Sequence, residues 1–234
     1  MKMTKLSLVA AFAVSSAFAG GDIAPVEVVE TPVVEESAFT ASANMAITSN
    51  YIWRGQTQTS NAPAIQGGID LGYNGFYLGT WLSNVDFNLA TDNSLEADFY
   101  AGYASELAGI GFDIGYIQYT FPNSSSVITD NLEEVYVGLS KDFGGFGING
   151  KYSFALDDTL FTDYWEVGAS AELPMDFGLS AAYGEQDDWG TNYIVSLSKT
   201  WGKFEFSVAY TDFSSDIVGL ADEDNVVGTI STSF

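Results

Sequence analysis

Acidic side chains supply most of the chemistry that this sequence could perform. Among its 234 residues are 31 aspartates and glutamates but only 7 lysines and arginines, which gives a formal net charge of −24. There is no histidine and no cysteine. Ser-His-Asp and Cys-His catalysis, and most zinc sites, need an imidazole or a thiolate, so the composition excludes them. The scarcity of basic residues also excludes nucleic acid as a partner, because its backbone is bound through many Lys and Arg contacts.

Several of these acids alternate with apolar residues. Glu96 and Asp98 do so within residues 95–101, Asp70 within 65–71 and Glu205 within 204–210. Alternation places successive side chains on opposite faces of a β-strand, so one face carries the acids and the other is apolar. The acids therefore depend on a sheet to gather them on one side.

The elements that must position these acids are predicted to be strands alone. No stretch after Ala38 shows a sustained helical period. Twelve segments have strand character, with ten or fourteen strands as alternatives, so the chain is predicted to be all-β and antiparallel. The segments cover roughly 39–54, 64–73, 76–84, 94–104, 110–120, 132–141, 146–155, 163–173, 177–184, 191–199, 203–211 and 225–234.

The connections between the segments alternate in length. Short turns follow every second segment, and Asn74-Gly75 is a strong hairpin signal because both turn positions need positive φ. The intervening connections, such as 56–63 and 211–224, are longer and polar. Transmembrane β-barrels have short periplasmic turns and longer outer loops. An antiparallel sandwich shows the same alternation, so the aromatic residues must decide between the two.

Aromatic residues gather near the ends of the segments. Such rings prefer the headgroup level of a membrane, which favours an antiparallel transmembrane β-barrel of about 12 strands. We expect a periplasmic girdle of Tyr73, Phe76, Phe143, Phe146, Phe177, Trp201, Phe204 and Phe234, and an outer girdle of Tyr51, Trp53, Phe154, Trp165, Tyr183 and Tyr210.

Both ends of the chain carry export signals. Residues 1–19 have the basic, apolar and small-residue regions of a signal peptide, and their apolar part is shorter than the ~20 residues of a spanning helix. Residues 20–37 are predicted to be an acidic flexible linker, and 38–234 the barrel. The terminal Phe234 is similar to the signal read by the barrel-assembly machinery. We expect the bacterial outer membrane, with its lipids and lipopolysaccharide as partners and both termini in the periplasm.

One region also resembles a known family. Residues 49–55 (SNYIWRG), 57–59 (TQT), 64–68 (AIQGG), 75–85 (GFYLGTWLSNV) and 95–103 (LEADFYAGY) resemble the TorF-like family of proposed porins, first grouped as conserved bacterial proteins of unknown function. The resemblance implies an outer-membrane barrel with a transport role, but no substrate and no binding residues. Trp53 stands where the family more often has Phe, which leaves its expected place in the outer girdle intact.

With the apolar faces towards lipid, nine charged residues are predicted to line a pore. Seven acids and two bases leave an excess of five negative charges, which favours cations. The alternative is that the acids pair with the two bases or face bulk water. The predicted pore-lining residues are Arg54, Asp70, Glu96, Asp98, Asp113, Glu134, Lys151, Glu166 and Glu205.

Arg54, the only arginine, is open to two interpretations. Its guanidinium could hold a pore acid or a folded-in loop at a constriction, because it binds carboxylates in a bidentate manner. Alternatively, it is a solvated cation at the rim.

The predicted function is a narrow, cation-preferring, porin-like channel for passive diffusion of small solutes, without a cofactor. A barrel of twelve strands is wider than an eight-stranded barrel, which its own side chains fill, and narrower than a wide porin. Tyr77, Trp81, Tyr100 and Tyr136 occupy alternate strand positions whose side chains are predicted to point into the barrel. The rival is an occluded barrel with a structural or surface-adhesive role. No enzyme activity is predicted, because barrel phospholipases, proteases and deacylases look dependent on histidine. Acidic outer-loop clusters such as 185–188 and 222–224 lack the spacing of a calcium loop and are expected to be solvated.

Overall fold

The computed structural model describes residues 39–87, 94–122, 132–156 and 162–234. The expected signal peptide and acidic linker lie outside these residues. Within them, no helix is long and apolar enough to cross a membrane.

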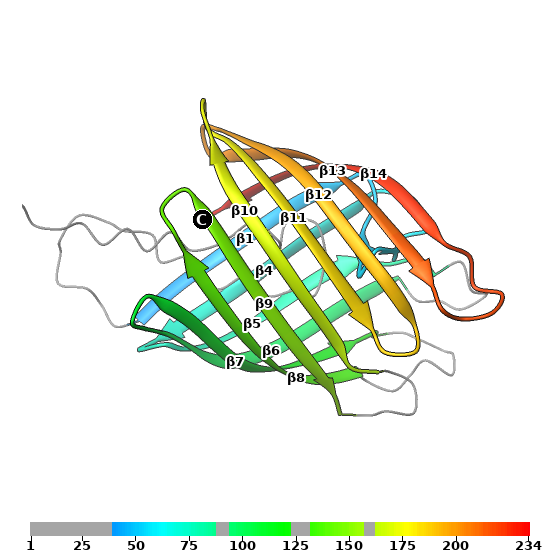
Figure 1. The fold of residues 1–234 in the computed structure, drawn as a ribbon, viewed down its shortest axis with the longest axis horizontal. Helices are drawn as coiled ribbons and strands as arrows, with labels where there is room; N and C mark the ends of the chain where they lie inside the picture. The colour runs from blue at the N-terminus through cyan, green and yellow to red at the C-terminus, as the bar shows by residue number, and fades with distance from the viewer. Residues whose placement is uncertain (1–38, 88–93, 123–131, 157–161) are drawn as a thin grey trace, which may run out of the picture.

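Twelve antiparallel strands form a closed barrel (Figure 1), which confirms the predicted fold class. Each strand pairs with its neighbour in the chain, and β1 closes the barrel against β14. The barrel strands are β1 (Phe39–Thr48), β4 (Ala64–Tyr73), β5 (Phe76–Asn84), β6 (Leu95–Leu107), β7 (Ile110–Thr120), β8 (Leu132–Asp142), β9 (Phe146–Ala155), β10 (Tyr164–Leu173), β11 (Phe177–Gln186), β12 (Gly190–Trp201), β13 (Phe204–Ser215) and β14 (Glu223–Ser233). Two short strands, β2 (Ile52–Trp53) and β3 (Gln56–Thr57), form a separate hairpin.

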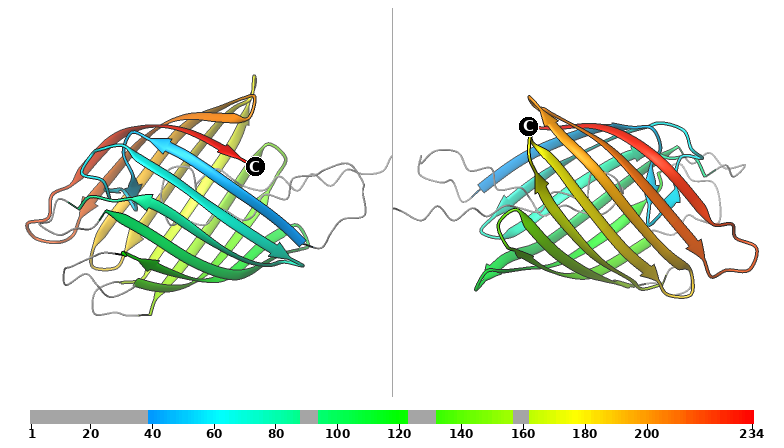
Figure 2. Two further views of the ribbon diagram at one scale, coloured as in Figure 1. Left: turned by 180° about the vertical axis from the view of Figure 1, so that it is seen from behind. Right: turned by 45° about the horizontal axis from the view of Figure 1, so that its top comes forward.

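The two ends of the barrel differ. The short turns and the carboxyl terminus gather at the left end in Figure 1, and the longer connections gather at the right. Figure 2 shows the same division from behind, with the β2–β3 hairpin in cyan at the end of the longer connections. We call this the outer end, following the loop-length pattern of membrane barrels.

The barrel is apolar on the outside. Phe99 and Leu78 are exposed, whereas Asp98 and Tyr77, their neighbours along the strands, are buried. A soluble sandwich would bury the apolar face, so this inversion is typical of a membrane barrel. Aromatic rings at the turn end, such as Trp201 and Phe234, are also exposed, as a girdle requires.

The first strand, β1, pairs with its two neighbours over different lengths. β1 pairs with β4 over ten positions, from Phe39↔Tyr73 to Thr48↔Ala64. It pairs with β14 over only five, from Asn44↔Ser233 to Thr48↔Thr229.

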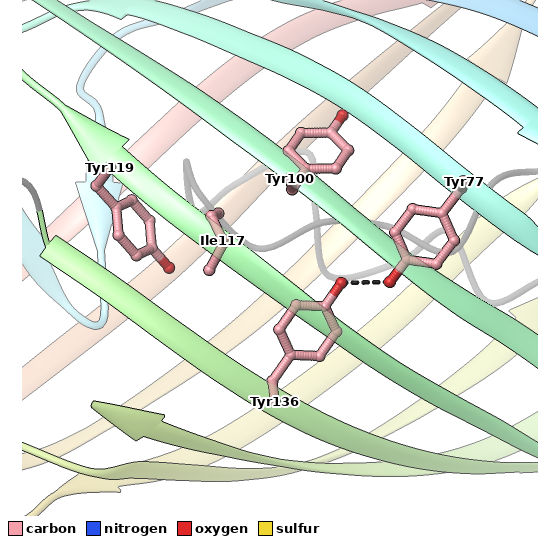
Figure 3. Close-up of a cluster of buried hydrophobic side chains, with 5 residues drawn as sticks. All are labelled: Tyr77, Tyr100, Ile117, Tyr119 and Tyr136. Carbon is pink, nitrogen blue, oxygen red and sulfur yellow. Dashed lines mark hydrogen bonds between the residues drawn. The ribbon is translucent and has the colours of Figure 1, made fainter. Parts of the chain in front are cut away.

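Four inward tyrosines lie along the wall, over glycines. Tyr100 reaches across Gly79 on the neighbouring strand, and its hydroxyl donates to Asp70 at 2.5 Å. Tyr77 and Tyr136 reach towards each other across Gly102 and Gly115, and their hydroxyls are hydrogen bonded (Figure 3). Tyr164 lies in the same way over Gly184. The missing side chains of these glycines let the rings span neighbouring strands.

Replacing Gly79 with alanine is therefore expected to destabilise the barrel by about 1–3 kcal/mol, the usual cost of overpacking. An added Cβ would meet the Tyr100 ring and hydroxyl at 2.5–2.6 Å, and Tyr100 is held in place by Asp70. Chemical denaturation in detergent micelles measures the loss. Gly228→Ala is the matched control, because a Cβ there meets nothing within 4 Å. Equal stability of the two variants would contradict the tyrosine–glycine packing.

Candidate functional site

The outer mouth of the barrel holds a folded-in hairpin, residues 49–63, which we call the mouth hairpin. β2 and β3 pair through Ile52↔Thr57 and Trp53↔Gln56. Arg54 and Gly55 form the turn, with φ of 46° and 82°. The Gln58 amide donates to the Tyr51 carbonyl at 2.7 Å, and the Tyr51 amide donates to Thr59 Oγ1 at 3.1 Å. These hydrogen bonds lie within the hairpin and do not involve the barrel wall.

The mouth hairpin contacts strands around much of the barrel. The Thr57 amide donates to Glu223 Oε2 at 2.9 Å on β14. The Trp53 ring makes an edge contact with Tyr119 on β7, and the Tyr51 ring makes one with Trp81 on β5. Because its contacts lie on opposite parts of the wall, the hairpin crosses the mouth.

Tyr51 and Trp53 were expected in the outer aromatic girdle, and that expectation is wrong. Tyr51 is only 1% exposed, and Trp53 packs against the inner cluster of Tyr119 and its neighbours. The first strand ends at Thr48 and not near residue 54, so both residues follow the hairpin inward. Phe154, Tyr183 and Tyr210 of the same predicted girdle are exposed.

The ion pair between Arg54 and Glu134 anchors the tip of the hairpin. Arg54 donates from Nη2 to Glu134 Oε1 at 2.6 Å, and both side chains are buried. The guanidinium lies over the Tyr164 ring, 4.0 Å from its centroid, and 4.4 Å from that of Trp53. Tyr119 donates to the other Glu134 oxygen at 3.3 Å.

The burial of Arg54 decides between its two interpretations. A solvated rim cation would be exposed, so that alternative is wrong. Burial acts to lower the pKa of Arg54, but the charge and hydrogen bond of Glu134, together with Tyr119 and Tyr164, more than offset it, and the pKa is raised above its ordinary value. Since β8 lies across the barrel from β1 in the strand order, the ion pair holds the hairpin over the mouth.

The other predicted pore-lining residues all lie on the less exposed face of their strands. Asp70 and Asp113 each accept a bond from a tyrosine, Asp113 from Tyr77 at 2.7 Å. Lys151 lies opposite Glu166 in the β9–β10 ladder, with its ammonium 5.9 Å from the Tyr136 ring centroid. Glu96 and Asp98 are buried together on β6, and Glu205 is half-buried on β13. The structure therefore gathers Arg54 with Glu134 and Glu96 with Asp98, and spreads the remainder around the wall.

Sequence reasoning missed Tyr119 and Tyr164, which flank Arg54. A signal was present, because Tyr119 has the parity of Asp113 on β7 and Tyr164 has that of Glu166 on β10. The acidic outer loops also do more than face solvent. Asp222 accepts from the Ser215 amide at 2.9 Å, and Glu223 holds the hairpin.

Comparison with known protein families finds one match. The model of a family described as "Bacterial protein of unknown function (Gcw_chp)" matches residues 33–233. No curated protein matches the chain.

Among solved structures, the chain is similar to one described as "KdgM porin", with a TM-score of 0.58, 10% identity, and coverage of 82% of this chain and 98% of that one. A "KdgM porin in complex with disordered oligogalacturonate" is similar with a TM-score of 0.57, 10% identity, and coverage of 83% and 98%. At this identity the likeness shows a shared barrel fold.

Proposed function

The chain belongs to this Gcw_chp family, and on that premise we propose that it is a narrow channel for passive diffusion of small solutes across the bacterial outer membrane. In this proposal both termini lie in the periplasm, and the barrel-assembly machinery recognises Phe234. Lipopolysaccharide surrounds the outer end of the barrel. The name of the TorF-like family stays a prediction, because the matched family carries no such name.

One observation carries the proposal: a closed barrel that is apolar outside and charged inside. An apolar outer face suits lipid, and a charged inner face suits water and solutes. A barrel that only displayed a surface structure would not need ionisable groups on its inner wall.

The charge balance supports a cation preference. Asp70, Glu96, Asp98, Asp113, Glu134, Glu166 and Glu205 outnumber Arg54 and Lys151, and the Arg54–Glu134 pair cancels itself. An acidic channel with low-dielectric walls concentrates cations and repels anions. Oligogalacturonate, named with the similar KdgM porin, carries many carboxylates, so this chain is better suited to small cations and uncharged solutes.

The barrel is expected to conduct in planar bilayers with a reversal potential displaced towards that of potassium in an about tenfold KCl gradient. Asp70→Asn/Asp113→Asn should reduce this displacement, because it removes two inner-wall charges. Asp222→Asn, in an exposed connection, is the control and should change it little. A preference for chloride would refute the cation assignment.

The structural or adhesive alternative gives a different result. A chain that migrates as a folded, heat-modifiable band on unboiled gels yet never conducts would favour an occluded barrel. Testing uptake of small cations and uncharged nutrients into liposomes containing the protein extends the comparison to solutes that carry no current.

A further inference from the structure

A pair of buried carboxylates lies under the mouth hairpin. Glu96 and Asp98 stand two positions apart on β6, so they point to the same side of the wall. Asp98 has no exposed surface and Glu96 has 4%. Within the described residues, both carboxylate oxygens of Asp98 and the Oε2 atom of Glu96 have no hydrogen-bond partner.

The two basic residues of the inner wall lie beside other acids. Arg54 pairs with Glu134, and Lys151 lies opposite Glu166. Two adjacent carboxylates that are removed from water repel each other, and each loses its solvation. Such a pair is relieved either by taking up protons or by binding a cation.

A third oxygen reaches the pair from the hairpin. The Tyr51 side chain interacts with both Glu96 and Asp98, and its hydroxyl is buried without a hydrogen-bond partner of standard geometry among the described residues. The ring is fixed by its edge contact with Trp81, at 5.4 Å between centroids. The hydroxyl is thus a neutral oxygen held beside two negative ones.

We propose that Glu96, Asp98 and Tyr51 bind a divalent hard cation, Ca²⁺ in the first place. Two carboxylates neutralise its charge, and oxygen is its preferred ligand. Among the described residues, no group of three or more Asp, Glu, His or Cys is arranged to hold a metal, so neutral oxygens complete the coordination. Ca²⁺ accepts irregular sets of six to eight oxygens, whereas Mg²⁺ demands near-octahedral geometry.

The cation would join the mouth hairpin to β6, on the side of the mouth away from Glu223 and β14. The inference goes beyond the proposed function, because the site would bind Ca²⁺ whether or not the barrel conducts. It also assigns Tyr51, from a loop, to the same site as two wall residues.

Calorimetric titration of the refolded, EDTA-treated mature chain in detergent micelles tests the site. We expect one Ca²⁺ per chain and a loss of affinity on the order of 100-fold in Glu96→Gln/Asp98→Asn, within the range over which ligand charge tunes calcium sites. Tyr51→Phe should weaken binding less, because a neutral ligand is lost. Asp70→Asn/Asp113→Asn is the matched control and should bind like the unmodified chain, since its two acids are held by tyrosines.

Thermal unfolding shows whether the variants fold. Ca²⁺ should raise the unfolding temperature of the unmodified chain and of the control but not that of Glu96→Gln/Asp98→Asn. In EDTA that variant should be at least as stable as the unmodified chain, because the repulsion is gone. Absence of binding at about 1 mM Ca²⁺, or unchanged binding in Glu96→Gln/Asp98→Asn, would overturn the proposal. Neither result depends on conductance, so failure of the site and failure of the channel are distinguishable.

Discussion

Arg54→Ala is expected to release the mouth hairpin and to destabilise the folded barrel by about 3–5 kcal/mol, the cost of breaking a buried ion pair from one side. Glu134 is 1% exposed and would keep its charge without its 2.6 Å partner. The guanidinium also leaves the faces of the Trp53 and Tyr164 rings. Single-channel conductance should rise, because the hairpin no longer crosses the mouth.

A double-mutant cycle separates the ion pair from simple loss of packing. Glu134→Gln in the Arg54→Ala background should recover part of the stability, because the uncompensated charge disappears. Chemical denaturation gives the free energy of unfolding for all four chains. If Arg54→Ala leaves both stability and conductance unchanged, the hairpin is no constriction.

Gly55→Val is expected to release the same hairpin without changing any charge. The φ of Gly55 is 82°, a conformation that costs other residues roughly 1–2 kcal/mol. A Cβ would also meet Asn192 Cβ at 2.8 Å, Phe213 Cβ at 2.9 Å and the Asp212 carbonyl at 3.0 Å. Strain and overpacking together should cost about 2–5 kcal/mol. We expect conductance to rise as in Arg54→Ala, while ion selectivity changes less.

Gly144→Val is the matched control for backbone strain. Gly144 has a φ of 80° in a short turn, but a Cβ there meets nothing within 4 Å. It should lose stability only through strain and keep the conductance of the unmodified chain. Equal conductance in Gly55→Val and Gly144→Val would contradict the role of the hairpin at the mouth.

Most of the wall was predictable from sequence, because its signals are local. β4, β5 and β9 have the predicted bounds, since period-two alternation and turn residues such as Asn74-Gly75 act over a few positions. The first strand was predicted to extend to residue 54. Its continuation, with Tyr51 and Trp53, has the composition of a strand end, but the chain leaves the wall at Thr48.

The site was predictable only in part. The alternation of apolar and polar residues places Glu134 and Arg54 near the interior. It does not predict that they meet, because they are 80 residues apart in the chain and on different parts of the barrel. The position of the mouth hairpin depends on Glu223, Phe213 and Glu134 together. No short window of sequence contains those contacts.

The short seam between β1 and β14 has a consequence for the order of folding. Every other pair of neighbouring barrel strands is consecutive in the chain, whereas Thr48 and Thr229 bond across a separation of 181 residues. Loop-closure entropy delays contacts of high sequence separation, so the hairpins should form first and the five pairs of the seam last. Until then β1 and β14 each have an unpaired edge, and lipid cannot form hydrogen bonds with the backbone groups of such an edge. We therefore expect the barrel to be stable in a membrane only once this seam is complete.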